Sequence, residues 1–411
     1  MDMLNNKWIR GVVPALGIHL CIGSVYAWSL FVEPIAEHLG CESRLVQIAF
    51  SLAIFFLGTS AAFAGPFVEK NVRRSSLLSC ACFVSGLLVT ALALHFRSLA
   101  GIYLGYGCLM GIGLGIGYIS PVKTLMMWFF DRKGLATGIA IMGFGFASTL
   151  AKWISTPILG VTGSIAATLA ILAGIYVVPM LAGALLIKKP YDDSVSVAHE
   201  NEVPFRYTGI LRNGVFVLIW LMFFLNIHCG LALISTAKPM IEAFAGTEIG
   251  AAAAAALGGT AVAVMGVFNG AGRLAFSAVS DRFRYRANIY IVIFALSVAT
   301  IAAAILSGFN RYALVAMLCV ISATYGAGFS NLPTLLADQF GMRNISKIHG
   351  LSLTAWAAAG LTGNQMSAAI YARFGSYDAV LYCLIPQFAL ALGIACYVLH
   401  KRRTSPSPKQ A

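Results

Sequence analysis

The chain has 411 residues, of which 59% are hydrophobic and only 10% are charged, with a mean hydropathy of +0.84. An average soluble domain carries about 25% charged residues, so this chain has too few polar side chains to cover a soluble surface. The composition excludes a cytosolic enzyme, a secreted disulfide scaffold and a disordered protein. It leaves a polytopic membrane protein, and the net charge of +13 then raises the question of where the positive side chains lie.

Apolar runs between polar segments predict twelve membrane-spanning helices, because one span needs about 20 apolar residues. Their ranges are Ile9–Phe31, Leu45–Val68, Ser76–Phe96, Ala100–Trp128, Leu135–Ile158, Ile165–Ile187, Gly214–Ile241, Ala251–Val279, Ile289–Phe309, Ala313–Leu336, Leu351–Ala372 and Ala379–Leu399. The first is too long for the apolar part of a signal peptide, and the next helix follows almost at once. The expected fold is an all-α integral membrane protein.

The lysines and arginines predict how these helices are oriented. If both termini are cytoplasmic, the cytoplasmic segments hold twenty of the 28 lysines and arginines, and the opposite loops hold only Arg44, Arg97, Arg311 and Arg373. This asymmetry is the positive-inside pattern, which places both termini in the cytoplasm. It also favours an even number of spans. A nucleic-acid-binding surface is disfavoured, because the charges are divided among separate short loops.

The longest polar connection, residues 188–213, divides the chain into two halves. We expect a six-helix lobe over 1–187, a cytoplasmic linker over 188–213, a second six-helix lobe over 214–400 and a cytoplasmic tail over 401–411. The halves resemble each other at an offset of 212 residues, since 65–74 falls on 277–286, Pro121 on Pro333 and Gly138 on Gly350. Two similar halves of six helices predict a parallel repeat, as in two-lobed transporters.

Four cations remain inside the predicted spans, Lys123, Lys152, Lys238 and Arg273, and none of the 15 acidic residues lies equally deep. Arg273 is eight residues before Asp281, which places it about 12 Å inside the cytoplasmic end of its helix. An arginine at that depth costs about 2.5–3.5 kcal/mol unless a wet cavity or an anion surrounds it. A guanidinium binds a carboxylate bidentately, so we expect Arg273 to hold an anionic substrate. The alternative is a structural arginine bonded to backbone carbonyls.

The other three deep cations give weaker evidence for a site. Lys123 lies near a basic cytoplasmic loop and either snorkels towards it or joins the site. Lys152 lies about 27 Å along its helix, where it either attracts anions to the outer mouth or snorkels. Lys238 precedes Pro239 at the outer end of its helix and is expected at the membrane interface.

Polar-tipped and aromatic residues complete the predicted cavity, because a small anion needs a few hydrogen-bond donors and aromatic walls. They are His19, Tyr26, Trp28, Tyr118, Asn226, His228, Tyr325, Phe329 and Trp356. Ordinary helix packing is the alternative for each of them. Trp28, near a helix end, is expected in the interfacial aromatic belt, and His228 is of a type that changes charge near neutral pH.

Sequence patterns for catalysis are absent, since there is no HExxH motif, no P-loop and no Ser-His-Asp setting on a soluble face. The glycines of Gly111–Gly117 lie within a long apolar helix with no preceding strand, so they do not form a dinucleotide-binding loop. Nine cysteines are spread along the chain and indicate neither a metal site nor a disulfide framework. We therefore expect no enzyme and no cofactor, and transport without an ATP site must use gradients or exchange.

The chain resembles the major facilitator superfamily in its six-plus-six helices and in the loops 65–74 and 277–286, although Glu69 replaces the usual Asp and Ser277 the usual Gly. It resembles the oxalate/formate antiporter family more closely, over nearly its whole length. The residues that carry this resemblance are Gly23–Leu30 with Pro34, Tyr118, Trp128–Ala136, Phe268–Arg273, Ser280–Asp281, Tyr325–Pro333 and Phe340–Gly341.

In oxalate/formate exchangers of that family, an arginine in helix 8 and a lysine in helix 11 hold the dicarboxylate. The arginine position matches Arg273, whereas Trp356 stands at the lysine position. The resemblance therefore implies one deep charge, which suits one carboxylate. It also implies aromatic walls at Tyr26, Tyr118 and Tyr325 or Phe329, and a helix 7 contribution from the region 226–228.

These observations predict a secondary transporter of small organic anions, a monocarboxylate such as lactate or pyruvate, working by alternating access with a proton as candidate coupling ion. The alternative is an oxalate/formate-type exchanger in which Lys123 or Lys152 replaces the missing lysine. A membrane sensor or channel on the same fold is a third hypothesis. The expected partners are a small carboxylate and the lipid bilayer, with no nucleic acid, and the chain is expected to be a monomer in a bacterial inner membrane.

Overall fold

A computed structural model describes residues 6–190 and 205–404, and helices are the only regular secondary structure in these two ranges. The middle of the predicted linker and the end of the predicted tail, including Lys409, lie outside the described residues.

The N-terminal bundle is built from rods that cross from one end of the molecule to the other. Its α-helices are α1 (Val13–Ile22), α2 (Ser29–Leu39), α3 (Ser43–Lys70), α4 (Val72–His95), α5 (Leu99–Ile102), α6 (Gly111–Trp128), α7 (Lys133–Thr162) and α8 (Ile165–Leu186). Three short stretches of different helical geometry, η2 (Trp8–Val12), η3 (Gly23–Trp28) and η4 (Tyr103–Met110), complete the rods Trp8–Leu39 and Leu99–Trp128.

The C-terminal bundle follows the short helix α9 (Tyr207–Leu211). It contains α10 (Gly214–Ile249), α11 (Ala251–Ser280), α12 (Ala287–Leu306), α13 (Arg311–Phe340), α14 (Ile345–Ser352), α15 (Thr354–Phe374) and α16 (Tyr377–Thr404). Several helices are longer than the predicted spans, since α10 continues past the expected end at Ile241 to Ile249. A predicted span ends where the chain turns polar, whereas the helix continues for one or two turns beyond the apolar zone.

Eleven helices of the described residues are long and apolar enough to cross a membrane. The remaining predicted span, Leu351–Ala372, corresponds to α14 and α15, which are separated at Leu353. It is less apolar than the others because α15 carries Thr354, Thr362 and Asn364. The fold is therefore the expected all-α membrane fold with two six-helix lobes.

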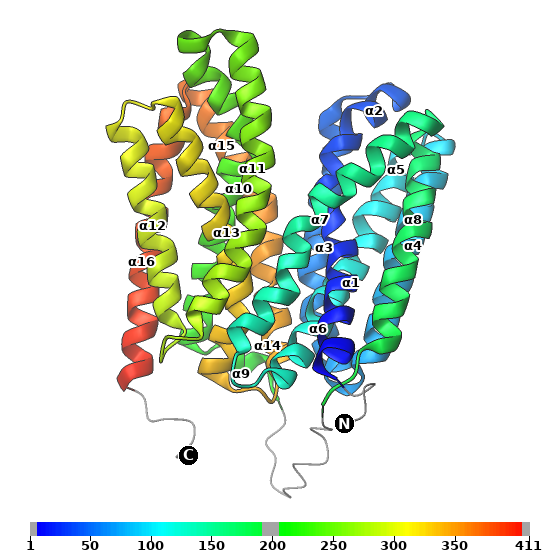
Figure 1. Ribbon diagram of the computed structural model, residues 1–411, viewed down its shortest axis with the longest axis vertical. Helices are drawn as coiled ribbons and strands as arrows, with labels where there is room; N and C mark the ends of the chain where they lie inside the picture. The colour runs from blue at the N-terminus through cyan, green and yellow to red at the C-terminus, as the bar shows by residue number, and fades with distance from the viewer. Residues whose placement is uncertain (1–5, 191–204, 405–411) are drawn as a thin grey trace, which may run out of the picture.

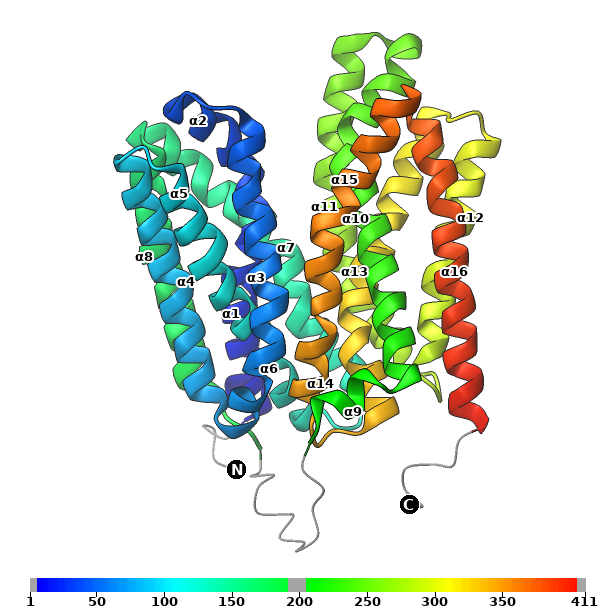
Figure 2. The same cartoon turned by 180° about the vertical axis from the view of Figure 1, so that it is seen from behind.

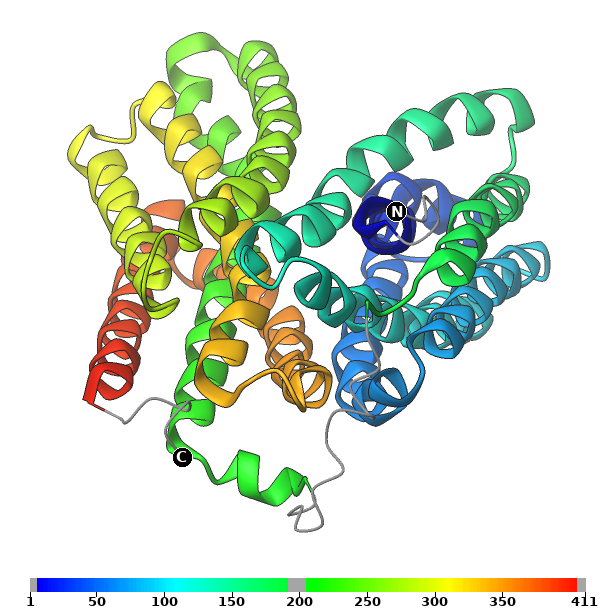
Figure 3. The ribbon, with the colours of Figure 1, turned by 60° about the horizontal axis from the view of Figure 1, so that its bottom comes forward.

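The two lobes lie close together at one end and diverge towards the other (Figures 1 and 2). Both ends of the described chain and α9 lie at the closed end, which the positive-inside pattern assigns to the cytoplasm. Figure 3, with this end brought forward, shows the N-terminal bundle, coloured blue to green, beside the C-terminal bundle, coloured green to red.

The same inter-lobe hydrogen bond occurs twice at the closed end. Asp281, at the end of α11, accepts from the backbone N–H groups of Gly134 and Leu135 in the first turn of α7, at 2.8 and 2.7 Å. Glu69, at the end of α3, accepts from the N–H of Ser346 in the first turn of α14, at 2.9 Å. These acids and N–H groups are related by the sequence offset of 212, as the predicted repeat requires. Each carboxylate caps a helix of the opposite lobe, where the helix dipole favours a negative charge.

Glycines allow this close approach. A Cβ atom on Gly134 would lie 2.2 Å from the carbonyl oxygen of Ser277, and one on Gly350 would lie 2.1 Å from that of Ala61. Any larger residue would push the two lobes apart, so both positions need glycine for the closed end to form.

Candidate functional site

Arg273 lies on α11 and is completely buried between the two lobes. Its Nε donates to Asn269 Oδ1 at 2.9 Å, and its Nη1 donates to the carbonyl oxygen of Ile141, on α7 of the other lobe, at 3.4 Å. Its Nη2 has no hydrogen-bond partner among the described residues. No carboxylate within the described ranges forms an ion pair with it, so the guanidinium keeps an unmatched positive charge and an unused donor.

The space around Arg273 is provided by two glycines. A Cβ on Gly145 of α7 would lie 3.0 Å from Arg273 Nε, and one on Gly326 of α13 would lie 3.0 Å from Arg273 Cγ. The guanidinium carbon then lies 5.6 Å from the ring centre of Phe144 and 5.1 Å from that of Phe329. Aromatic faces attract a cation, so these rings stabilise the charge without neutralising it.

Six aromatic residues surround this arginine, and we refer to Tyr26, Tyr118, Phe144, Tyr325, Phe329 and Trp356 as the aromatic box. The ring centres of Tyr118 and Trp356 are 5.4 Å apart, and those of Phe329 and Trp356 are 4.5 Å apart. The hydroxyl groups of Tyr26 and Tyr325 are within 3.2 Å of each other. Tyr26, Tyr118 and Phe144 belong to the N-terminal lobe, whereas Tyr325, Phe329 and Trp356 belong to the C-terminal lobe. The box is therefore closed only when the two lobes meet.

Three buried donors of the box make no hydrogen bond of good geometry with the described residues: Arg273 Nη2, Tyr118 OH and Trp356 Nε1, although the Tyr118 hydroxyl faces the guanidinium. Leaving a buried polar group unpaired costs about 1–3 kcal/mol, more if it is charged. A fold retains such groups when something else supplies the acceptors. One positive donor, two neutral donors and aromatic walls match a small ligand that carries oxygen acceptors and one negative charge.

Of the sequence-predicted residues, the structure brings Arg273, Tyr26, Tyr118, Tyr325, Phe329 and Trp356 together. Asn226 borders the group, and its Nδ2 donates to the carbonyl oxygen of Tyr325 at 3.3 Å. His228 contacts the Thr362 hydroxyl at 2.9 Å and the Met366 sulfur at 3.0 Å on α15, within its own lobe. Lys152 is exposed, and Lys238 pairs with Glu242 at 3.7 Å.

No acid was expected as deep as the four cations inside the spans, yet Lys123 is neutralised by one from a helix end. Its ammonium forms a buried ion pair with Glu69, the same carboxylate that caps α14, and also contacts the carbonyl oxygen of Arg343 at 3.4 Å. Glu69 ends its own helix, yet α3 and α6 pack so that its side chain reaches the cytoplasmic part of α6. Lys123 therefore belongs to the closed end of the molecule.

The expectation that Trp28 lies in an interfacial belt is also wrong. Its side chain is 1% exposed, its indole N–H donates to the carbonyl oxygen of Val46 at 3.3 Å, and its ring packs 3.8 Å from that of Tyr106. The helix continues through α2 to Leu39, so Trp28 lies well inside the rod and fills the core of its lobe.

Sequence reasoning missed three residues at this site: Phe144, Asn269 and His349. His349 is 2% exposed, its Nε2 has no partner among the described residues, and its ring lies 6.0 Å from that of Tyr118. It lies in α14, outside the predicted span Leu351–Ala372, so no spacing within a predicted helix pointed to it. Asn269 lies one turn before Arg273, and that spacing was an available signal. Phe144 had no such signal.

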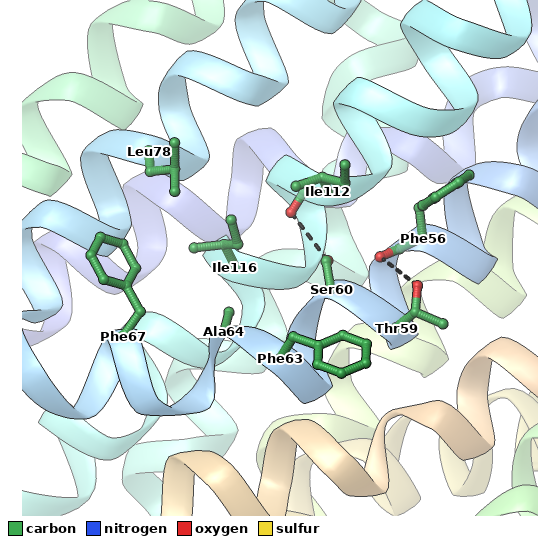
Figure 4. A pocket seen from close by; sticks show the side chains of 9 residues that line it. All are labelled: Phe56, Thr59, Ser60, Phe63, Ala64, Phe67, Leu78, Ile112 and Ile116. Atoms are coloured by element: carbon green, nitrogen blue, oxygen red, sulfur yellow. Dashed lines mark hydrogen bonds between the residues drawn. The ribbon is translucent and has the colours of Figure 1, made fainter.

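A separate cavity of about 520 Å³ lies against α3, α4 and α6, and Figure 4 shows the side chains that line it, among them Phe63, Phe67 and Ile116. Its two hydroxyls are already used, since Thr59 donates to the carbonyl oxygen of Phe55 at 2.8 Å and Ser60 to that of Ile112 at 3.2 Å. None of its lining residues is charged, so this groove is not an anion site.

The chain belongs to the major facilitator superfamily, because the model of that family matches residues 15–400. It is 27% identical to the oxalate:formate antiporter of Oxalobacter formigenes over 97% of this chain and 92% of that protein. It is also 27% identical to the uncharacterised MFS-type transporter YhjX of Escherichia coli (strain K12), over 84% of this chain and 83% of that protein. The fold matches the crystal structure of the superfamily transporter FucP in the outward conformation, with a TM-score of 0.72, 15% identity and coverage of 96% and 99% of the two chains.

The protein is therefore an integral membrane transporter of this superfamily, and its relatives and fold indicate transport rather than enzymatic catalysis. The similarity to the oxalate:formate antiporter extends over almost the whole chain, as the sequence motifs predict.

The unpaired hydroxyl of Tyr118 yields a test by substitution. We expect Tyr118→Phe to leave the melting temperature of the ligand-free protein unchanged or higher, because it removes a buried unsatisfied group. The matched control is Tyr106→Phe, whose hydroxyl donates to the carbonyl oxygen of Val25 at 3.1 Å in the same lobe. That control should lower stability by about 0.5–1.5 kcal/mol or more. Equal destabilisation of the two variants in thermal unfolding would show that the Tyr118 hydroxyl has a structural partner.

Proposed function

We propose that the protein is a secondary transporter of small carboxylates, with a monocarboxylate such as lactate or pyruvate as the preferred substrate. The observation that supports this most strongly is the unneutralised guanidinium of Arg273 inside the aromatic box. A bound carboxylate accepts hydrogen bonds from Nη2 and from the neutral donors Tyr118 and Trp356, and it supplies the missing negative charge. The rings of the box lie close together, with centres 4.5 Å apart for Phe329 and Trp356 and 5.4 Å apart for Tyr118 and Trp356, which favours a substrate of a few carbon atoms.

The charge of the box supports one carboxylate over two. Trp356 stands where the resemblance to oxalate/formate exchangers calls for a lysine, and Lys123 is paired with Glu69 at the closed end. Lys152 is exposed, away from the buried groups of the box. A second carboxylate in the box would thus meet only neutral donors and would lose its hydration without an opposing charge.

Alternating access follows from how the two lobes share the site. We assign the moving units to residues 1–187 and 214–400, with 188–213 as the linker between them. The caps by Asp281 and Glu69 close the cytoplasmic end, and the substrate enters from the opposite, divergent end (Figure 1). A carboxylate held between Arg273 and Tyr118 contacts both lobes and neutralises a buried charge. It therefore lowers the energy of the occluded state relative to that of the empty carrier.

An oxalate/formate-type exchanger is the second candidate function, favoured by the 27% identity to the Oxalobacter formigenes antiporter. Both functions use Arg273 and differ in whether a second carboxylate finds a partner. We further propose that the protein acts as a monomer in a bacterial inner membrane.

The test of the function is uptake into proteoliposomes that contain the purified protein. We expect uptake of labelled pyruvate or lactate by the wild type. Arg273→Ala should abolish it, and Arg273→Lys should lose most of it, because a lysine keeps the charge but not the planar fork. Arg311→Ala, which removes a partly exposed arginine paired with Glu248, is the matched control. Wild-type rates in Arg273→Ala would contradict the site, and counterflow with oxalate but not with pyruvate would favour the exchanger.

The missing second cation predicts a gain of function. Trp356→Lys introduces a positive charge into the box, and we expect it to improve the affinity for oxalate relative to pyruvate by tenfold or more, about 1.4 kcal/mol. The measurement is competition of both anions against labelled substrate, with Trp220→Lys as a control outside the box. If Trp356→Lys folds and the ratio of the two affinities does not change, Trp356 does not determine the number of carboxylates bound.

A further inference from the structure

His19 lies on α1 and is completely buried, and both of its ring nitrogens face backbone carbonyl oxygens. Nδ1 is 3.0 Å from the oxygen of Ala15 on the same helix, and Nε2 is 3.2 Å from the oxygen of Tyr118 on α6. A carbonyl oxygen only accepts hydrogen bonds, whereas a neutral imidazole has one donor and one acceptor nitrogen. Only the doubly protonated ring satisfies both contacts, so the fold holds a place for one additional proton at His19.

This position is adjacent to the aromatic box. Tyr118 provides the carbonyl that faces His19, packs its ring edge-on at 5.5 Å against the imidazole, and has its unpaired hydroxyl in the box. On α7, a Cβ at Gly143 would lie 3.4 Å from the Cβ of His19, and a Cβ at Gly145 would lie 3.0 Å from Arg273 Nε. Gly143 and Gly145 face opposite sides of α7, so this helix lies between the histidine and the arginine, and Tyr118 is the residue that contacts both His19 and the box.

The other ionisable groups around His19 leave Arg273 as the charge that matters. His349 of α14 lies on the far side of Tyr118, at 6.0 Å ring to ring. The neighbouring elements also contribute Tyr26 and Tyr176, and α7 contributes Lys133 and Lys152. Arg10 donates through Nη1 to the carbonyl oxygen of Leu186, and Lys123 pairs with Glu69. Burial is the larger obstacle to a charge on the His19 imidazole, and the positive charge of Arg273 adds to it. Like charges repel strongly in a low-dielectric interior.

We propose that His19 binds the proton that accompanies the substrate anion through the transport cycle. In the empty carrier, Arg273 opposes a second positive charge at His19. A carboxylate on Arg273 cancels that repulsion, so the imidazole takes up a proton from water and donates to both carbonyls. Anion and proton then increase each other's affinity by the same factor. This inference rests on the proposed carboxylate function and assigns its coupling residue.

The charge balance of this cycle is simple. The empty site carries Arg273 alone, at one positive charge. The loaded site carries Arg273, protonated His19 and one carboxylate, again at one positive charge. Loaded and empty carriers cross the same electrical barrier, so transport of a monocarboxylate is an electroneutral symport with one proton. No other bond is made or broken.

The experiment is calorimetric titration of the purified protein with sodium pyruvate in two buffers of different ionisation enthalpy, which yields the number of protons taken up. We expect net proton uptake on pyruvate binding in the wild type, approaching one proton per pyruvate, and a dissociation constant that rises with pH. His19→Gln should bind pyruvate with no proton uptake and no pH dependence. His38→Gln is the control, since that histidine, on α2, contacts one carbonyl oxygen, that of Leu94.

Each outcome either supports or overturns the assignment of His19 as the proton-binding residue. Proton uptake retained in His19→Gln, or lost in His228→Gln instead, overturns the assignment of His19 while leaving the carboxylate site intact. Pyruvate binding to the wild type with no proton uptake does the same and needs no variant, so misfolding of His19→Gln does not prevent the test. Binding of no carboxylate by the folded wild type overturns the proposed function and this inference with it.

Discussion

A buried guanidinium without a carboxylate is the constraint on which the rest of this structure depends. In water its charge would be solvated, and in a soluble interior an aspartate or glutamate would normally face it. Here α11 places Arg273 between the lobes, where its described neighbours offer an amide oxygen, a backbone carbonyl and two aromatic faces. These groups stabilise the cation only partly, and under the proposed function the substrate supplies the negative charge.

The closed end and the aromatic box treat buried charge in opposite ways. At the closed end, each acid caps a helix of the other lobe, and Glu69 also neutralises Lys123, so charges are matched and the lobes are held together. At the aromatic box, the lobes meet through rings and through the Tyr26–Tyr325 contact, and the charge is unmatched. A carrier benefits from this division, because the caps hold one conformation while the site stays responsive to substrate.

The sequence alone predicted the class, the two lobes, the repeat and the deep position of Arg273 in its helix, because each depends on composition or on spacing along one helix. It failed where two distant helices meet. Glu69 reaches Lys123 across α3 and α6, and Trp28 is buried because η3 continues the rod into α2. Phe144 looked like any other apolar helix residue until α7 was placed beside Arg273. His19 was recognised as a polar candidate, but its second carbonyl, from Tyr118, becomes visible only once α1 and α6 are packed.

The central claim is that the anion site in the box is completed by a small carboxylate. The most direct measurement is thermal unfolding of the purified protein against a panel of small carboxylates, with amines and sugars of similar size as controls. Specific binding to the folded state raises the melting temperature with ligand concentration. The account predicts stabilisation by small carboxylates and none by amines or sugars. Stabilisation by amines or sugars alone would contradict it.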